Sequence, residues 1–150
     1  MYVQKTDYKG RITIELLNLL IAEDEGNILA EASKIAEDTI ASQVNVLYDV
    51  SGEFAKTGAN RNYYLLTMAI NIALYNIYQR ADDEDIPKKV IKNHDDTMND
   101  LALISKGKNT IDLPPRVNTD PAAPGNDPNN PIQGFGLRRW GSNPKRTHQI

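Results

Sequence analysis

The chain has 150 residues, of which 40% are hydrophobic and 25% are charged, and this composition is ordinary for a single globular domain. Because it contains no cysteine and only two histidines, a disulfide framework, a thiolate zinc site and a cysteine nucleophile are excluded, and a multi-histidine metal centre is disfavoured. The formal net charge of -3 combines an acidic body with a basic end.

The first predicted elements are helical. Thr6 is placed to cap a short turn that ends at Gly10, and Thr13 is placed to cap a helix over about residues 13–22. The polar run from Glu23 to Asn27 then forms a break. A longer helix is expected over about residues 28–47, because its apolar side chains recur with a helical period: Ile28, Ala32, Ile35, Ala36, Ile40, Val44 and Leu47.

The helix expected over about residues 61–80 is the most apolar of the chain, and it follows a loop over residues 49–58. Apolar residues lie on nearly all of its sides, so we expect it to pack centrally among the others. Asn71 lies in its narrow polar strip. We expect this amide to hydrogen-bond a neighbouring helix, because leaving it buried and unpaired would cost about 1–3 kcal/mol.

The last helix is expected over about residues 87–105, with Asp85 as its N-cap and Pro87 in its first turn. His94 is expected to pack at the core edge, and Gly107 lies where a left-handed cap belongs. Residues 110–113 alternate like a short strand, which two prolines end. The side chains predicted to face inward are Val90, Ile91, Met98, Leu101 and Ile104.

Charge and proline content divide the chain near residue 113. Residues 1–112 hold 12 Lys and Arg against 18 Asp and Glu, whereas residues 113–150 hold five basic residues against two acidic ones. Seven of the eight prolines lie from Pro114 onward. We therefore predict an all-α domain over residues 1–112, a bundle of about four main helices with a short strand-like exit. An extended, non-helical, Pro/Asn/Gly-rich arm is predicted over residues 113–150.

No catalytic or metal site is predicted. The acidic run from Glu23 to Asn27 has the wrong spacing for a calcium loop, and the run from Asp82 to Asp85 is explained by helix capping. The sequence holds no phosphate-binding glycine loop and no nucleophile motif. We therefore expect a protein that is not an enzyme and binds no cofactor. We also expect neither a signal peptide nor a membrane span.

The arm carries aromatic and basic side chains that are typical of interface anchors. A segment that cannot fold alone yet carries such anchors is expected to become ordered on a partner. The predicted partner-binding residues are Phe135, Leu137, Arg138, Arg139, Trp140, Lys145 and Arg146. A second prediction is strand addition to a neighbour's sheet edge by Thr110, Ile111, Asp112 and Leu113.

Over about residues 1–114, the order of these pieces resembles the small head–tail connector (neck adaptor) family of tailed bacteriophages, of the type found in Mu-like prophages. Four segments carry the resemblance. They are the opening Met1-Tyr2-Val3 with Thr6-Asp7, the helix end Ala73-Leu74-Tyr75-Asn76-Ile77-Tyr78-Gln79-Arg80, the loop and helix from Ile86 to Asp96, and the ending Leu101 to Lys108 with the exit from Ile111 to Pro114.

The resemblance implies a structural role. Such proteins form a homo-oligomeric ring, usually of twelve copies, below the portal protein of a filled capsid. They present a surface to the next neck or tail-completion protein, and packaged double-stranded DNA passes through the ring. The chain would then belong to the virion neck and would be assembled in the host cytoplasm without contact with a membrane.

A second reading comes from another functional class. The chain could be a small helical regulatory or binding protein that recruits nucleic acid or a protein partner through its basic tail. The salt dependence of binding distinguishes the two functions. Contacts with phosphate groups weaken steeply as the salt concentration rises, whereas anchoring by apolar side chains does not.

Overall fold

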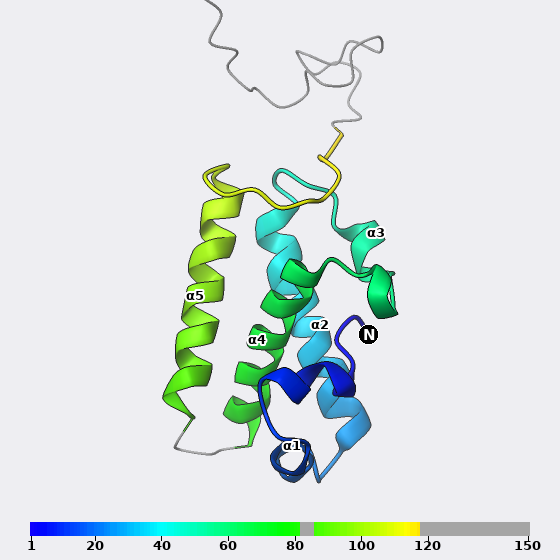
Figure 1. Ribbon diagram of the computed structural model, residues 1–150, viewed down its shortest axis with the longest axis vertical. Coiled ribbons are helices and arrows are strands. Elements are labelled where there is room, and N and C mark those ends of the chain that lie inside the picture. Colours follow the sequence, from blue (N-terminus) through cyan, green and yellow to red (C-terminus); the bar gives the residue numbers. More distant parts are fainter. Residues whose placement is uncertain (82–85, 118–150) are drawn as a thin grey trace, which may run out of the picture. The chain divides into compact units, whose positions relative to one another are not determined.

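The computed structural model describes residues 1–81 and 86–117, and over these ranges the chain is a helical bundle (Figure 1). The predicted all-α class is therefore confirmed. The compact unit comprises Met1–Arg116 and is four residues longer than the domain predicted over residues 1–112. In chain order its elements are the 3₁₀ helix η1 (Lys5–Gly10), α1 (Ile14–Leu20), α2 (Glu25–Val44), α3 (Ser51–Phe54), the 3₁₀ helix η2 (Gly58–Asn60), α4 (Tyr63–Arg80) and α5 (Lys88–Ser105).

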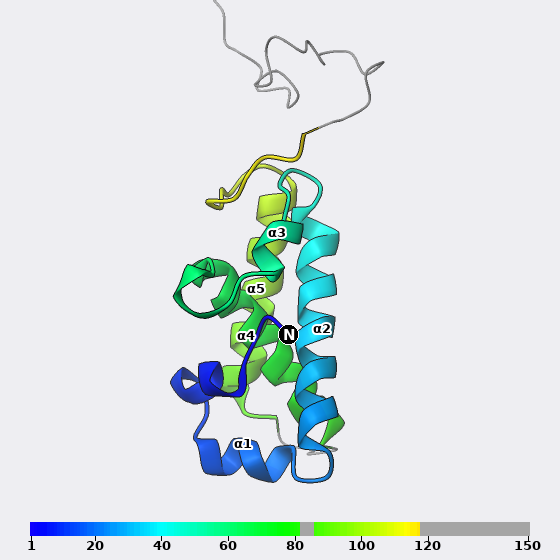
Figure 2. The ribbon, with the colours of Figure 1, turned by 90° about the vertical axis from the view of Figure 1, so that its right-hand side faces the viewer.

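The three long helices lie side by side and alternate in direction. Each of α2, α4 and α5 contacts the other two. The short helix α1 lies crosswise at the end of the bundle where α2 begins (Figure 2). None of the helices in the described ranges combines the length and apolarity needed to cross a bilayer.

The helix α4 forms the centre of the core, as its composition predicts. Eleven of its 18 residues are buried, on sides that face both α2 and α5. Its Asn71 donates from Nδ2 to Thr97 Oγ1 of α5 over 3.0 Å, which confirms the predicted bond to a neighbouring helix. A second polar contact joins the same two helices, because Tyr64 Oη of α4 donates to Asp100 Oδ2 of α5 at 3.2 Å.

At two helix ends, a single residue forms the predicted cap. Thr13 Oγ1 accepts a hydrogen bond from Leu16 N at 3.4 Å, which confirms the predicted cap of α1. Gly107 has a φ of 67°, and the N–H groups of Gly107 and Lys108 donate to the carbonyls of Ile104 and Leu103. This pattern is a Schellman motif, and it confirms the predicted left-handed cap after α5.

Other helix ends differ from the predictions. The first turn is not capped by Thr6, because Gln4 precedes it and Asp7 Oδ2 accepts from Gln4 N at 2.7 Å. The helix α2 begins at Glu25, since acidic residues stabilise a first turn instead of breaking it. The predicted loop over residues 49–58 contains α3. Ile91 does not face inward and is 38% exposed. The helix α5 begins at Lys88, so Pro87 is its N-cap and not part of its first turn. Asp85, the residue predicted for the N-cap, lies outside the described residues.

The strand predicted over residues 110–113 is not formed. Residues 112 and 113 form a bend, Leu113 N donates to Ile111 O at 2.9 Å, and Ile111 is buried in the core. Extended pairing occurs just afterwards: Asp49 N donates to Pro114 O and Arg116 N donates to Leu47 O, both at 2.9 Å. The exit therefore pairs with the chain's own loop after α2.

Candidate functional site

The residues predicted to bind a partner fall in two places. Thr110, Ile111, Asp112 and Leu113 lie in the described body, where Asp112 O accepts a hydrogen bond from Asn62 Nδ2 at 3.0 Å. The arm residues Phe135, Leu137, Arg138, Arg139, Trp140, Lys145 and Arg146 lie outside the described residues. The described body contains two candidate sites: a buried polar cluster and a surface groove.

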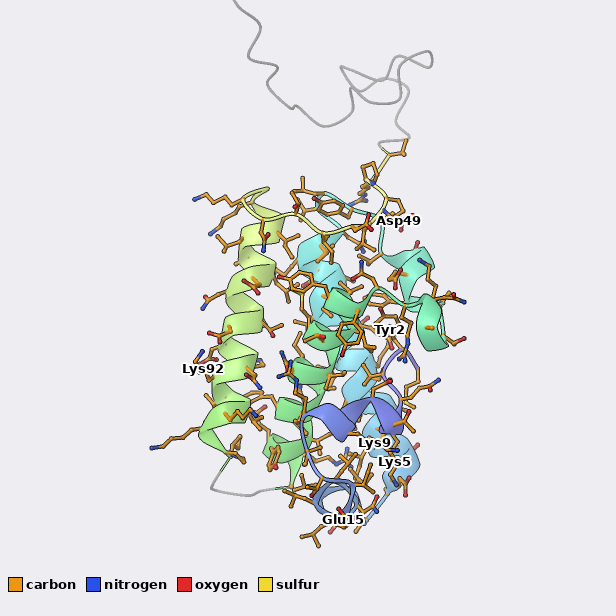
Figure 3. All side chains as sticks on the ribbon, viewed as in Figure 1. Tyr2, Lys5, Lys9, Glu15, Asp49 and Lys92 are labelled. Carbon is orange, nitrogen blue, oxygen red and sulfur yellow. The ribbon has the colours of Figure 1, made fainter. Side chains whose placement is uncertain are left out.

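The polar cluster begins where the N-terminal segment lies against α2. Tyr2 N donates to Glu37 Oε1 at 2.9 Å, and Val3 N donates to Ser33 Oγ at 3.1 Å. Ser33 Oγ in turn donates to Glu37 Oε1 at 2.8 Å. The backbone of a segment outside any helix is thereby satisfied by side chains of α2, and the Tyr2 ring lies inside the body (Figure 3).

Arg61 joins this segment to the start of α4. Its guanidinium donates to both carboxylate oxygens of Asp7, at 2.6 and 2.9 Å, and to Tyr2 O at 2.7 Å. Its Cζ also lies 5.8 Å from the centre of the Tyr2 ring. Burial alone would raise the pKa of Asp7, but the Arg61 guanidinium and the Gln4 N–H hold that pKa below its usual value.

Glu53 of α3 completes the cluster and is itself buried. Its carboxylate accepts hydrogen bonds from Tyr2 Oη at 3.1 Å, from Lys56 Nζ at 2.7 Å and from Asn62 N. Burial acts to raise the pKa of Glu53, and the three donors outweigh it and lower the pKa. Because these charged groups already have partners, the cluster has the properties of a structural clamp and not of a poised acid or base.

His94 packs as predicted at the edge of the core. Its ring stacks on Tyr75 with centroids 4.0 Å apart and an interplanar angle of 20°, and its Nδ1 lies 3.3 Å from Asp95 Oδ1. Within residues 1–81 and 86–117, no three His, Asp or Glu side chains are grouped so that they could hold a metal ion.

The groove lies between the first half of α2 and the last turns of α4 and has a volume of about 200 Å³. It is lined by the buried side chains of Ile28, Ala32 and Ile77 and by Ile35, which is 39% exposed. Glu31 and Arg80 close one rim with an ion pair of 2.5 Å. Small-molecule pockets usually have roughly 300–1,000 Å³, so this groove suits a side chain better than a cofactor.

Sequence reasoning missed both features. The apolar period of α2 includes Ile35 but gives no sign that its neighbours leave it half covered. Glu53 carries no motif, because its partners Tyr2 and Asn62 are distant in the chain.

The chain is similar to a known protein family. A family model described as "Bacteriophage Mu, Gp36" matches residues 2–127, which comprise nearly the whole described body and the first part of the arm. No curated protein and no solved structure matches the chain significantly.

Proposed function

Because the chain belongs to the bacteriophage Mu Gp36 family and is therefore a phage protein, we propose that it is a structural subunit of the virion. In this role it is a head–tail connector that forms a ring between the portal protein and the next neck or tail component. The observation that carries the proposal is the family match, since it covers the same helical body whose helix ends resemble the connector family.

The construction of the body supports this role. A ring subunit must keep its shape while neighbouring subunits contact it on several sides. In this body, the first and the last segments of the described chain are both bound to the helices or to the loops between them. The N-terminal segment is held by Arg61 and Glu53, and the exit segment is paired with the loop after α2. Such long-range contacts make a rigid building block out of a short chain.

The charge of the body also supports the proposal. Residues 1–112 carry six more acidic than basic side chains. DNA passing through a ring of such bodies meets like charge, which disfavours adhesion of the polyanion to the wall. The basic arm has the opposite sign and suits contacts with acidic protein surfaces.

Reconstitution tests the proposal. The full-length chain is mixed with the portal protein of the same phage, and the complexes are analysed by native mass spectrometry and negative-stain electron microscopy. We expect an additional ring stacked on one end of the portal, with about as many copies as the portal has subunits. A portal that stays free at every ratio of the two proteins contradicts the connector function.

The five basic residues of the segment 113–150 favour one alternative, recruitment of nucleic acid by the arm. Binding of the full-length chain to labelled duplex DNA separates the two functions. An arm that neutralises several phosphates loses orders of magnitude in affinity between about 50 and 200 mM salt. A connector binds its portal with little dependence on salt and binds free DNA weakly at all salt concentrations.

A further inference from the structure

The groove between α2 and α4 has an apolar floor without a covering element in the described part of the chain. Ile28, Ala32 and Ile77 are buried at its base, whereas Ile35 stays 39% exposed although it follows the same helical period. A half-exposed isoleucine beside a hollow of about 200 Å³ offers a site for one or two bulky apolar side chains.

Charge around the groove favours a basic occupant. Arg80 on the rim is already paired with Glu31 at 2.5 Å, so it does not present a free positive charge. Of the three acidic residues that precede the groove residues of α2, Glu23 and Asp24 are exposed, and Glu25 is paired with Lys5 at 2.7 Å. A segment that combines aromatic side chains with arginine therefore matches the groove in both polarity and charge.

The chain itself contains such a segment beyond the described body. The six residues Phe135-Gly136-Leu137-Arg138-Arg139-Trp140 hold the only tryptophan and one of the two phenylalanines of the chain, next to two arginines. We propose that the α2–α4 groove of each copy binds the Phe135–Trp140 segment of a second copy. This inference rests on the proposed ring function and identifies one contact between its neighbouring subunits.

The length of the arm is sufficient for this contact. Arg116 is anchored at Leu47, beyond the end of α2, whereas the groove lies along the first half of α2. Trp140 follows Arg116 by 24 residues. A chain of that length spans at most about 80–85 Å at about 3.3–3.6 Å per residue, against about 30 Å for the 20 residues of α2. The arm can therefore reach across a neighbouring body, and one such head-to-tail contact repeated around a ring uses every arm and fills every groove.

Disulfide trapping tests the proposal cleanly, because the chain has no cysteine of its own. One batch of full-length protein carries Thr39→Cys, one helical turn beyond Ile35 on α2, and the other carries Gly141→Cys next to Trp140. The two are mixed, oxidised and separated on a non-reducing gel. We expect the mixed disulfide dimer to exceed the yield of a Lys92→Cys control by about tenfold. Lys92 is 73% exposed on the outer side of α5 (Figure 3).

A matched pair of groove variants gives a second readout. Ile35 and Ile91 are exposed to almost the same extent, 39% and 38%, and both lie on long helices. Ile35→Glu is expected to lower the trapping yield by about tenfold, whereas Ile91→Glu leaves it unchanged, with the same helical circular dichroism in both. Equal yields for the two variants, or for the groove and control cysteines, overturn the proposal.

Two further outcomes separate this contact from its rivals. When Thr39→Cys and Gly141→Cys are placed in one chain, an intramolecular disulfide at every protein concentration shows that the arm fills its own groove and overturns the contact between copies. A chain that is present in virions but gives no trapped dimer refutes the groove contact alone. A trapped dimer from a chain that is absent from virions refutes the connector function and retains the contact.

Discussion

Replacing Glu53 with alanine tests the claim that a buried polar clamp holds the N-terminal segment to the body. The carboxylate accepts hydrogen bonds from Tyr2 Oη, Asn62 N and Lys56 Nζ. Glu53→Ala removes the acceptor and leaves the first two donors without it in poorly hydrated surroundings. The variant therefore measures a lost acceptor and not only a lost side chain.

The magnitude follows from the surroundings of the three donors. Hydrogen bonds to a charged acceptor contribute about 1.5–3 kcal/mol each, and the two from Tyr2 and Asn62 are buried or partly buried. The Lys56 side chain is 48% exposed, so its ion pair adds only about 0–1 kcal/mol. We expect Glu53→Ala to lower the free energy of unfolding by about 3 kcal/mol and the Tm by about 10 °C.

Urea unfolding followed by far-UV circular dichroism measures this change. Tryptophan fluorescence is unsuitable because the only tryptophan lies in the arm. Glu25→Ala is the control, since Glu25 forms an exposed ion pair with Lys5 and is expected to cost less than about 1 kcal/mol. A loss of less than about 1 kcal/mol in Glu53→Ala would refute the clamp.

The clamp also predicts how stability depends on pH. The pKa values of Asp7 and Glu53 are both lowered in the folded state. The contribution of these carboxylates to the free energy of unfolding is therefore complete above their unfolded-state pKa values of about 3.9 and 4.3. It is lost as the pH falls through the lower folded-state values. We expect the urea midpoint to decline below about pH 4 and the decline to be shallower in Asp7→Asn with Glu53→Gln. An identical decline in both proteins contradicts this account.

Three further predictions concern a buried amide, a helix cap and the arm. Thr97→Val removes the acceptor of the buried Asn71 amide and should cost about 2 kcal/mol in urea unfolding; a neutral effect would show that the amide finds another partner. Gly107→Ala should cost about 1 kcal/mol through its φ of 67° alone, because the added methyl group would meet only Leu47 at an ordinary 3.7 Å. Arg139→Ala with Trp140→Ala should leave circular dichroism and Tm unchanged and weaken assembly with the portal, and unchanged assembly would exclude the arm as a lock.

Much of the fold follows from the sequence because the signals are local. The helix α4 is apolar on nearly all sides, and this property alone predicts its central place. Thr13 and Gly107 act within one turn of their own helices, so their roles as caps can be read directly from their positions. The polar partner of Asn71 is likewise expected from the cost of burying a lone amide.

The features that could not be predicted depend on contacts between distant segments. Glu53 lies in what reads as a loop, and it is buried because Tyr2, 51 residues away, reaches it. The exit residues follow the loop after α2 instead of forming their own strand, because the bonds of Leu47 and Asp49 hold them there. The groove depends on how the side chains of α2 and α4 pack against one another around Ile35, which periodicity within one helix does not encode.

The copy number in purified virions tests the central claim most directly. Quantitative peptide mass spectrometry of particles from the phage that encodes this chain gives its ratio to the portal subunit, before and after the tails are removed. The account predicts a ratio close to one that remains with the heads. Absence of the chain from particles would contradict the connector function.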